Sequence, residues 1–226
     1  MWYNINTYVW DGDHVKPVGP QQLATQRLIL RPPQMEDTEA LVRIKSLPMS
    51  LTEGKKAVAS MVDELRKPFT FHWIITLDGT VIGRIKAWDV NPYNGNLQLG
   101  YDVGPEYRGR GYMTEAMKAV VRFMLTDAQA NRVYCSVRAG NTASRRVCEK
   151  AGLTLEGIMR QHYARQDGGY DDVCIYGIVR SDMEEKHEHG HERYEPDAGG
   201  PSGTLCRLVG AGRSGARQEQ AAVDAC

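Results

Sequence analysis

The stretch from Leu97 to Leu125 constrains the fold more than any other part of this chain of 226 residues. Apolar residues alternate with polar or small ones from Leu97 to Val103, which is the period of a strand with two different faces. Gly104 and Pro105 end that strand. Five apolar side chains then recur at spacings of three and four residues, which predicts an amphipathic helix: Met113, Met117, Val120, Val121 and Met124. A strand joined directly to a helix is therefore expected.

The turn between this strand and this helix reads Arg108-Gly109-Arg110-Gly111-Tyr112. Two glycines allow the backbone to turn tightly and a ligand to approach it closely. The amide N–H groups in the first turn of a helix are free, and the helix dipole favours negative charge there. Together with two arginine side chains, these features predict a pyrophosphate site. A Gly-x-Gly turn by itself is also compatible with a plain connection.

Two common phosphate-binding motifs are excluded in this turn. It lacks Gly-Lys-Ser/Thr, and it lacks both the Gly-x-Gly-x-x-Gly spacing and the acidic residue of a dinucleotide site. The turn resembles the acyl-CoA loop of the GCN5-related N-acetyltransferases (the GNAT family), Gln/Arg-x-x-Gly-x-Gly/Ala, which here reads Arg108-x-x-Gly111-x-Met113. The last position departs from that pattern. Gly-Tyr-Met-Thr-Glu-Ala is similar to a variant in the family's ribosomal-protein-alanine N-acetyltransferase branch.

Further segments carry the same resemblance, which covers roughly Thr25 to Ser181. They are Thr-x-Arg-Leu-x-Leu-Arg-Pro from Thr25, Asn141-x-x-Ser144 followed by Cys-Glu-Lys-Ala-Gly-Leu, and Tyr-Asp-Asp-Val from Tyr170. Periodicity and turn signals predict the order β–α–α–β–β–β–α–β–α–β–β, an α/β chain with a mixed sheet. The resemblance implies the GNAT acyl-CoA N-acyltransferase fold: a mixed seven-stranded sheet with helices on both faces and a splayed central strand pair.

The chain divides by composition into three parts. Residues 1–24 are expected to form an N-terminal arm, and residues 25–183 an N-acetyltransferase domain. Residues 186–226 contain few large apolar side chains, so a disordered C-terminal tail is expected there. Within the domain, the pattern predicts a helix from Glu36 to Leu47 and a second helix capped by Thr52.

Composition excludes several classes of function. A formal net charge of zero argues against nucleic acid or an anionic membrane as a partner. No apolar run has the length of a membrane-spanning helix, and no signal peptide is recognisable. The five cysteines are odd in number and include no Cys-x-x-Cys pair, which favours reduced thiols and a cytoplasmic location. His187, His189 and His191 lack a companion ligand cluster, so no metal site is predicted.

The resemblance implies acetyl-CoA as the cosubstrate and assigns contacts to it. The pyrophosphate is expected on the loop formed by Arg108, Gly109, Arg110, Gly111, Tyr112 and Met113. Backbone amides in the splayed strand, at Tyr101, Asp102 and Val103, are expected to hold the thioester carbonyl, where negative charge develops during attack.

Two residues of the next helix complete the expected cofactor site. The resemblance places Asn141 on the pantetheine arm and Ser144 near the sulfur, as a hydrogen-bond donor to the leaving thiolate. Asn141 is equally well placed to cap its helix. Arg145 and Arg146 follow. Their charges are compatible with contacts to phosphates, but facing water is the favoured expectation for both, because most surface charges are solvated.

Acetyl transfer also requires a group that deprotonates the amine. Many relatives have a glutamate where this chain has Gln98, and the ribosomal-protein branch has a carboxylate where this chain has Tyr163. Histidine is the side chain most often used as a general base near neutral pH, so His162 is the candidate base. Strand alternation predicts that His162 and Tyr163 point to opposite faces. The predicted catalytic residues are therefore Ser144, His162 and Tyr163, with ordinary strand positions as the alternative for the last two.

Two functions follow. The first is an acetyl-CoA-dependent N-acetyltransferase that moves the acetyl group to a primary amine, either a protein N-terminus or a small molecule. Direct attack in a ternary complex is implied, because no activated Cys–His pair is visible. The alternative is an acyl-CoA-binding module with weak or lost catalysis, acting as a sensor or interaction protein. A monomer and a homodimer are both compatible with the sequence.

Overall fold

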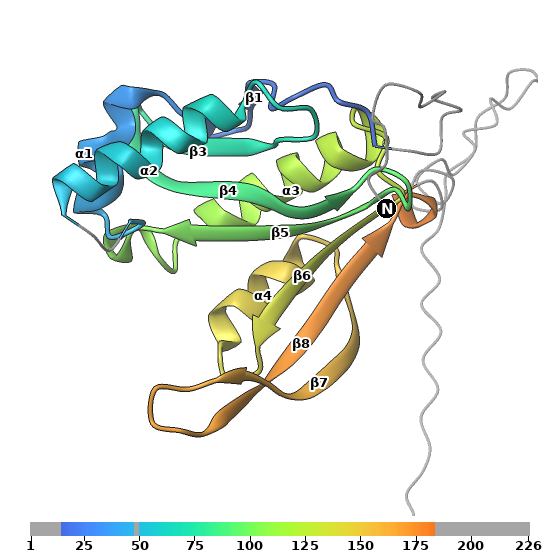
Figure 1. Ribbon diagram of the computed structural model, residues 1–226. Coiled ribbons are helices and arrows are strands. Elements are labelled where there is room, and N and C mark those ends of the chain that lie inside the picture. Colours follow the sequence, from blue (N-terminus) through green and yellow to red (C-terminus); the bar gives the residue numbers. More distant parts are fainter. Residues whose placement is uncertain (1–14, 48–49, 184–226) are drawn as a thin grey trace, which may run out of the picture. The chain divides into compact units, whose positions relative to one another are not determined.

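The computed structural model describes residues 15–47 and 50–183, which form one mixed sheet with helices on both faces (Figure 1). The sheet has eight strands in the order β1-β2-β3-β4-β5-β6-β8-β7. The strands are β1 Leu23–Ala24, β2 Leu28–Arg31, β3 His72–Leu77, β4 Thr80–Asn91, β5 Asn96–Val103, β6 Arg132–Arg138, β7 Thr154–Ala164 and β8 Tyr170–Val179. The helices are α1 Thr38–Arg43, α2 Leu51–Glu64, α3 Tyr112–Thr126 and α4 Thr142–Lys150, with short 3-10 turns at Met35–Asp37 and Pro105–Tyr107.

The predicted fold class is confirmed, but the expected number of strands was one too low. The additional strand is β1, whose two residues pair antiparallel with β2 through Leu23↔Leu30 and Ala24↔Ile29. It lies inside the segment that the sequence assigned to the N-terminal arm. Two residues are too few to show a period of two, so periodicity could not reveal this strand.

The apolar stripes of the helices bury against the two faces of the sheet. One core cluster joins the sheet to α3 and α4 and includes Trp73, Leu99 and Met117, each at most 2% exposed. A smaller cluster on the other face joins α1 and α2 to Ile74 and Val81. The central strands are therefore covered on both sides, and α3 is held rigidly behind the turn that precedes it.

The first two helices begin and end differently from the prediction. Leu41, Ile44 and Leu47 are buried, as the predicted helix required, but α1 ends at Arg43 because Lys45 takes a positive φ of 60°. The cap of α2 is Ser50 rather than Thr52. The Ser50 side chain accepts from the Glu53 amide while the Glu53 carboxylate accepts from the Ser50 amide, which is a capping box.

The expected splay of the central strands is present. Strands β5 and β6 run parallel but pair only through Asn96↔Arg132, Leu97↔Val133 and Gln98↔Tyr134. Both strands continue beyond these pairs, and they diverge in Figure 1. The Leu99 backbone still hydrogen-bonds the Cys135 side chain, and from Gly100 to Val103 the edge of β5 that faces β6 has no strand partner.

The outermost strand on the far side, β7, is irregular. Its pairing with β8 is interrupted by bulges between Leu155 and Gly157 and between Met159 and Tyr163. In the second bulge Gln161 takes a φ of 53°, and its backbone N–H donates to the Asp172 carboxylate at 2.8 Å. A bulge of this kind breaks the alternation of side chains along a strand.

Part of the predicted N-terminal arm packs on the domain. Val15 is fully buried in the main core, the Lys16 amide donates to the Ala128 carbonyl at 2.7 Å, and the Trp73 indole donates to the Gln21 carbonyl at 2.7 Å. Residues 1–14 and the predicted tail, with its three histidines, lie outside the described residues. Within the described residues, no helix is long and apolar enough to span a membrane.

A buried histidine makes stability depend on pH. His72 is 1% exposed, and its Nε2 has no hydrogen-bond partner in the described part of the chain. Burial, reinforced by the nearby charges of Arg84 and Lys86, lowers the pKa of His72 to about 3. The unfolded chain therefore binds this proton below about pH 6.5 while the folded chain does not. Stability should be complete above that pH and fall as the pH decreases, by at most about 1.4 kcal/mol per unit.

Denaturant midpoints measured between pH 7 and pH 5 test this expectation. The His72→Gln variant should show a flatter pH dependence than the parent, whereas His162→Gln, which changes an exposed histidine, should keep the parent's slope. An unchanged slope in His72→Gln would assign the acid sensitivity to other groups.

Candidate active site

The turn before α3 exposes a row of unpaired amides. Gly109 and Gly111 take positive φ angles of 74° and 81°, and Gly111 is the N-cap of α3. Among the described residues, no acceptor receives a hydrogen bond from any amide between Gly109 and Thr114. Successive free N–H groups at a helix N-terminus form a concave site for an anion. The geometry thus has the form that a pyrophosphate requires.

The two arginines of this loop differ in how they are held. Arg108 is held against the end of the preceding strand, β5, because its Nε donates to the Val103 carbonyl at 3.4 Å. Arg110 is exposed, and its side chain contacts no partner in the described part of the chain. The loop therefore presents one anchored and one free cation beside the unpaired amides.

Across the splay, the side chain of Tyr101 reaches from β5 to α4. The Ser144 hydroxyl donates to the Tyr101 hydroxyl at 2.9 Å, and the Tyr101 hydroxyl donates to the Ser144 carbonyl at 3.1 Å. The Cys148 sulfur lies 3.5 Å from the same phenol oxygen. Burial and the neighbouring Cys148 thiol raise the pKa of Tyr101 far above its ordinary value, so this phenol stays protonated. Two predicted cofactor residues are thereby brought into contact.

Asn141 caps α4, as one of its two predicted roles required. Its side-chain oxygen accepts from the Ser144 amide at 3.1 Å, which fixes the first turn of the helix next to the splay. Asn141 itself is exposed, so its amide nitrogen is accessible to a ligand. Contact with a pantetheine arm stays a prediction.

Arg146 is exposed, as expected, whereas Arg145 is only half-exposed and bonds to other side chains. The Arg145 Nε donates to the Tyr176 hydroxyl at 3.1 Å, and that hydroxyl donates to the Glu149 carboxylate at 2.9 Å. The buried phenol of Tyr176 needs partners and lies under the helix, so it draws Arg145 inward. Arg145 consequently secures α4 to β8.

Asp102 uses its side chain to hold another part of the fold. Its carboxylate accepts from the Arg84 Nε at 2.8 Å and from the Ser46 hydroxyl, while Arg84 also donates to the Ser46 carbonyl at 2.9 Å. Ser46 lies in the connection between α1 and α2. The predicted role of Asp102 concerned only its backbone amide, and these contacts show that the side chain anchors this connection to β4 and β5.

The predicted separation of His162 and Tyr163 was wrong. The bulge at Gln161 breaks the alternation, and the two rings contact each other with centroids 4.9 Å apart. The Arg138 guanidinium lies over the Tyr163 ring at 4.9 Å, which places Tyr163 next to the end of β6. His162 is exposed. Both residues therefore lie on the same part of the β7–β8 hairpin.

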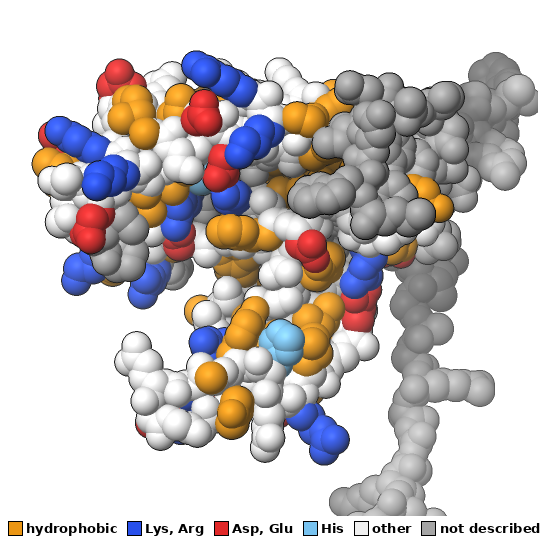
Figure 2. Space-filling model, in the orientation of Figure 1, with side chains coloured by type: hydrophobic (Ala, Val, Ile, Leu, Met, Phe, Trp, Pro, Cys, Tyr) orange, Lys and Arg blue, Asp and Glu red, His pale blue; other side chains and the backbone are white. Residues whose placement is uncertain are grey.

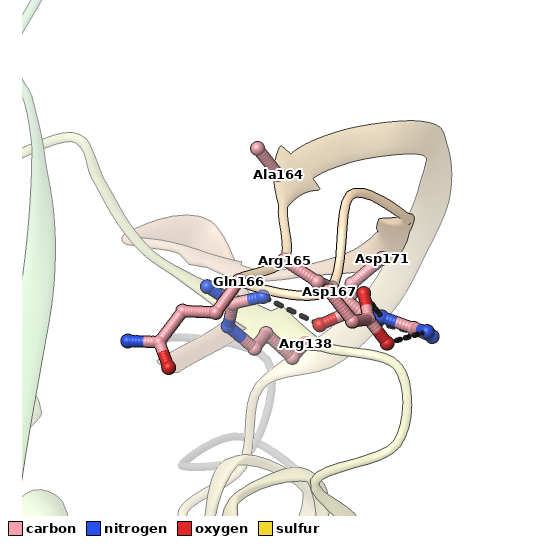
Figure 3. A pocket seen from close by; sticks show the side chains of 6 residues that line it. All are labelled: Arg138, Ala164, Arg165, Gln166, Asp167 and Asp171. Atoms are coloured by element: carbon pink, nitrogen blue, oxygen red, sulfur yellow. Dashed lines mark hydrogen bonds and ion pairs between the residues drawn. The ribbon is translucent and has the colours of Figure 1, made fainter.

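A pocket of about 480 Å³ lies at the tip of this hairpin (Figure 3) and is lined by Arg138, Ala164, Arg165, Gln166, Asp167 and Asp171. Arg138 pairs with Asp171, and Arg165 pairs with Asp167. Each arginine is balanced by an aspartate, so the lining carries no surplus of either charge.

The face of the sheet opposite α3 carries no carboxylate at the position of the family glutamate. Gln98 stands there, paired with Trp88 on β4 and with Tyr134 on β6. The Trp88 indole is 52% exposed and lies against Gly100, where an added Cβ would be only 2.4 Å from Nε1. The Lys86 ammonium lies 4.5 Å from the centroid of the same indole. An aromatic surface therefore flanks the start of the splay.

Sequence reasoning missed the pair formed by Arg27 and Glu115, of which Arg27 contacts the loop before α3. The Glu115 carboxylate accepts from the Thr25 hydroxyl at 2.6 Å and from the Arg27 amide at 2.8 Å. The Arg27 Nε donates to Glu115 at 2.7 Å. Arg27 precedes Glu115 by 88 residues, and no local pattern signals a pair at that separation. The resemblance of the Thr25 segment to a family motif was the sole indication.

Comparison with known proteins identifies the family. The sequence model of the acetyltransferase (GNAT) domain matches residues 27–154, more than half of the chain. An uncharacterized N-acetyltransferase, p20, of Bacillus licheniformis is 25% identical over 173 residues, covering 71% of this chain and 97% of that protein. The ribosomal-protein-serine acetyltransferase of Escherichia coli is 25% identical over 127 residues, covering 56% of this chain and 70% of that enzyme.

Solved structures agree with this assignment. A ribosomal L7/L12 alpha-N-protein acetyltransferase (RimL) in complex with coenzyme A has a TM-score of 0.65 at 21% identity, over 70% of this chain and 98% of that one. RimJ of Mycobacterium smegmatis in complex with CoA-disulfide has a TM-score of 0.66 at 23% identity, over 73% and 90%. Both structures share the fold of this chain, and the named relatives include enzymes of the ribosomal-protein branch that the sequence resembles. The chain belongs to the GNAT family of acetyl-CoA-dependent N-acetyltransferases.

Proposed function

We propose that this enzyme transfers the acetyl group of acetyl-CoA to a primary amine, at a protein N-terminus or on a small molecule, by direct attack in a ternary complex. The observation that carries the proposal is the row of unpaired amides from Gly109 to Thr114 beside an open splay of β5 and β6. The loop has the form of a pyrophosphate site, and the unpaired edge of β5 offers amides to a chain that runs along it.

The relatives support a protein N-terminus as one class of acceptor. One is the ribosomal-protein-serine acetyltransferase of Escherichia coli, and another is the [ribosomal protein uS5]-alanine N-acetyltransferase of the same organism, which is 27% identical over 84 residues. An exposed aromatic residue, Trp88, at the start of the splay is suited to the first side chain of a peptide or to the body of a small amine.

Each step of acetyl transfer has a candidate group in this chain. The loop amides hold the pyrophosphate, and amides of the β5 edge stabilise the negative charge that develops on the thioester oxygen. The Ser144 hydroxyl donates a hydrogen bond to the sulfur as it leaves. The single proton of this hydroxyl points to the Tyr101 oxygen, 2.9 Å away, before the reaction, so the hydroxyl rotates to reach the sulfur and the Tyr101 hydroxyl then donates to the Ser144 oxygen in exchange.

The cysteines support direct transfer rather than an acetylated enzyme. Cys135, Cys148 and Cys174 are buried, and none of them hydrogen-bonds a histidine in the described part of the chain. The hydrogen bond with Cys148, together with burial, raises the pKa of the Cys135 thiol well above its ordinary value. The same hydrogen bond lowers the pKa of the Cys148 thiol, but Cys148 is fully buried. A nucleophilic cysteine needs an accessible thiolate, and a buried thiol does not provide one.

His162 is the proposed general base, because it is exposed on the hairpin that flanks β6. If it accepts the proton of the amine, His162→Gln should lower kcat/KM and remove the acid limb of the pH–rate profile. Steady-state rates between pH 5.5 and 9 test this. Gln166→Ala changes another exposed residue of the same hairpin and serves as the matched control. An acid limb that survives in His162→Gln would show that His162 is not the base.

Turnover of acetyl-CoA with a panel of amines tests the proposed function. The panel contains peptides with free and blocked N-termini, polyamines and amino sugars, and release of the CoA thiol is followed. A free N-terminus or a small primary amine should give saturable turnover. Tight binding of acetyl-CoA without turnover of any amine would favour the alternative, an acyl-CoA-binding module.

A further inference from the structure

Arg27, directly before β2, lies against the loop that precedes α3. Its Nη1 donates to the Arg110 carbonyl at 3.2 Å, and its Nη2 lies 3.5 Å from the position that a Cβ on Gly111 would occupy. Its guanidinium carbon stands 4.6 Å from the centroid of the Tyr112 ring. Arg27 therefore contacts three consecutive residues of the loop, although it lies far away in the sequence, just before β2.

Arg27 is itself held in place by Glu115. Its amide, its Nε and its Nη2 all approach the Glu115 carboxylate, at 2.8, 2.7 and 2.7 Å. Thr25 adds a fourth hydrogen bond to the same carboxylate. Burial raises the pKa of Glu115, but the hydrogen bonds from Thr25 and Arg27 outweigh burial and leave the pKa below its ordinary value. The guanidinium thus has a single orientation.

We propose that Arg27 is a positioning residue that pre-organises the loop for the pyrophosphate of CoA. The inference rests on the proposed function, because it requires the loop to bind that group. It adds a residue outside the loop motif, and a mechanism by which this residue acts.

The first part of the mechanism is geometric. In a planar trans peptide the N–H points opposite to the C=O of the same unit. By holding the Arg110 carbonyl, Arg27 turns the Gly111 amide away from itself, to the side where no acceptor is present in the described structure. A binding group that is already oriented loses less conformational entropy when the ligand arrives.

The second part is electrostatic. Glu115 lies in the first turn of α3, one turn from the unpaired amides, where an isolated carboxylate would repel a pyrophosphate. Its ion pair with Arg27 cancels that charge. The side chain of Arg27 is still 41% exposed, so the pair lies at the surface of the loop and not under it. Loss of Arg27 would therefore both release the Arg110–Gly111 peptide unit and expose a negative charge.

The test compares ligands with and without the pyrophosphate. CoA affinity is measured by calorimetry, and turnover is measured with acetyl-CoA and with S-acetylpantetheine, which lacks the nucleotide and both phosphates of the bridge. Arg27→Gln should weaken CoA binding roughly tenfold to a hundredfold, as expected for loss of a charge-assisted contact. Its kcat/KM with S-acetylpantetheine should stay within about twofold of the parent's.

Two further variants keep the result interpretable. Arg27→Lys retains a cation beside Glu115 but cannot hold the carboxylate and the Arg110 carbonyl together. It should keep the parent's melting temperature and still weaken CoA binding several-fold. Arg122→Gln removes an exposed arginine from the same helix as Glu115, away from the loop, and should change neither ligand.

The results that would reject the role of Arg27 differ from the result that would reject the proposed function of the loop. Equal losses with acetyl-CoA and S-acetylpantetheine would mean that Arg27 supports the fold alone, and the proposal would be rejected. Parental CoA affinity in both Arg27 variants would reject it as well. If instead Gly111→Glu retained CoA affinity, the loop would not be the pyrophosphate site, and the proposed function of the loop would fail first.

Discussion

Gly111→Glu is expected to abolish CoA binding. Gly111 takes a φ of 81°, which a residue with a Cβ adopts at a cost of about 1–2 kcal/mol. The new side chain would start 3.5 Å from the Arg27 guanidinium and place a carboxylate among the amides that are open to the pyrophosphate. Repulsion between like charges in a partly desolvated site adds several kcal/mol to that strain. Calorimetry with CoA should show no saturable binding.

Gly19→Glu is the matched control for that variant. Gly19 takes a φ of 65°, and no atom lies within 4 Å of the Cβ that it would gain. It follows Lys16, whose amide donates to the Ala128 carbonyl beyond the C-terminal end of α3, at the opposite end of this helix from the loop. The control therefore introduces the same charge and a similar backbone strain away from the loop. It should lower the melting temperature slightly and leave CoA affinity unchanged. Parental affinity in Gly111→Glu would show that the pyrophosphate binds elsewhere.

Ser144→Ala is expected to lower kcat by roughly tenfold to a hundredfold while leaving CoA affinity nearly intact. Removing one donor to a developing charge costs about 2–4 kcal/mol in the barrier, and a water molecule that replaces the hydroxyl would reduce the loss. Tyr101→Phe should reproduce part of the effect, because the phenol that lies 2.9 Å from the Ser144 oxygen, and that can donate to it once the serine proton turns to the sulfur, would be gone. Single-turnover rates and CoA titrations separate chemistry from binding.

Thr142→Ala and Asn141→Ala are the two comparison variants for Ser144→Ala. Thr142 carries an exposed hydroxyl in the same helical turn, and its loss should not change kcat. Asn141→Ala removes the cap of α4, which costs about 1 kcal/mol of stability, and should weaken CoA binding if the pantetheine contact exists. If Ser144→Ala reduced CoA affinity and kcat/KM by the same factor, Ser144 would be a binding residue and its proposed role at the leaving sulfur would be wrong.

Most of the fold was predictable because its signals are local. The alternation from Leu97 to Val103 and the stripe from Met113 to Met124 predicted β5, the turn and α3, since both periods are set by burial on one face. The resemblance of that turn to a known loop then supplied the family. The cap of α4 by Asn141 was predictable for the same reason, because a cap involves neighbouring residues only.

The parts that were not predictable depend on contacts between distant residues. The bulge at Gln161 exists because its amide meets the Asp172 carboxylate, and no pattern in β7 indicates where such a pairing defect falls. It reversed the expected orientation of His162 relative to Tyr163. The pair of Arg27 and Glu115 likewise forms because β2 and the first turn of α3 meet in the folded chain.

The short pairing of β5 with β6 has a consequence for the ligand-free protein. A sheet normally exposes backbone hydrogen-bonding groups at its two outer strands, but here a second pair of edges opens inside the sheet beyond Gln98. Open strand edges recruit extended segments of other chains, which is a route to aggregation. Acetyl-CoA bound between these inner edges would cover them and stabilise the folded chain. A protein preparation from which CoA has been removed should therefore precipitate faster than one saturated with CoA.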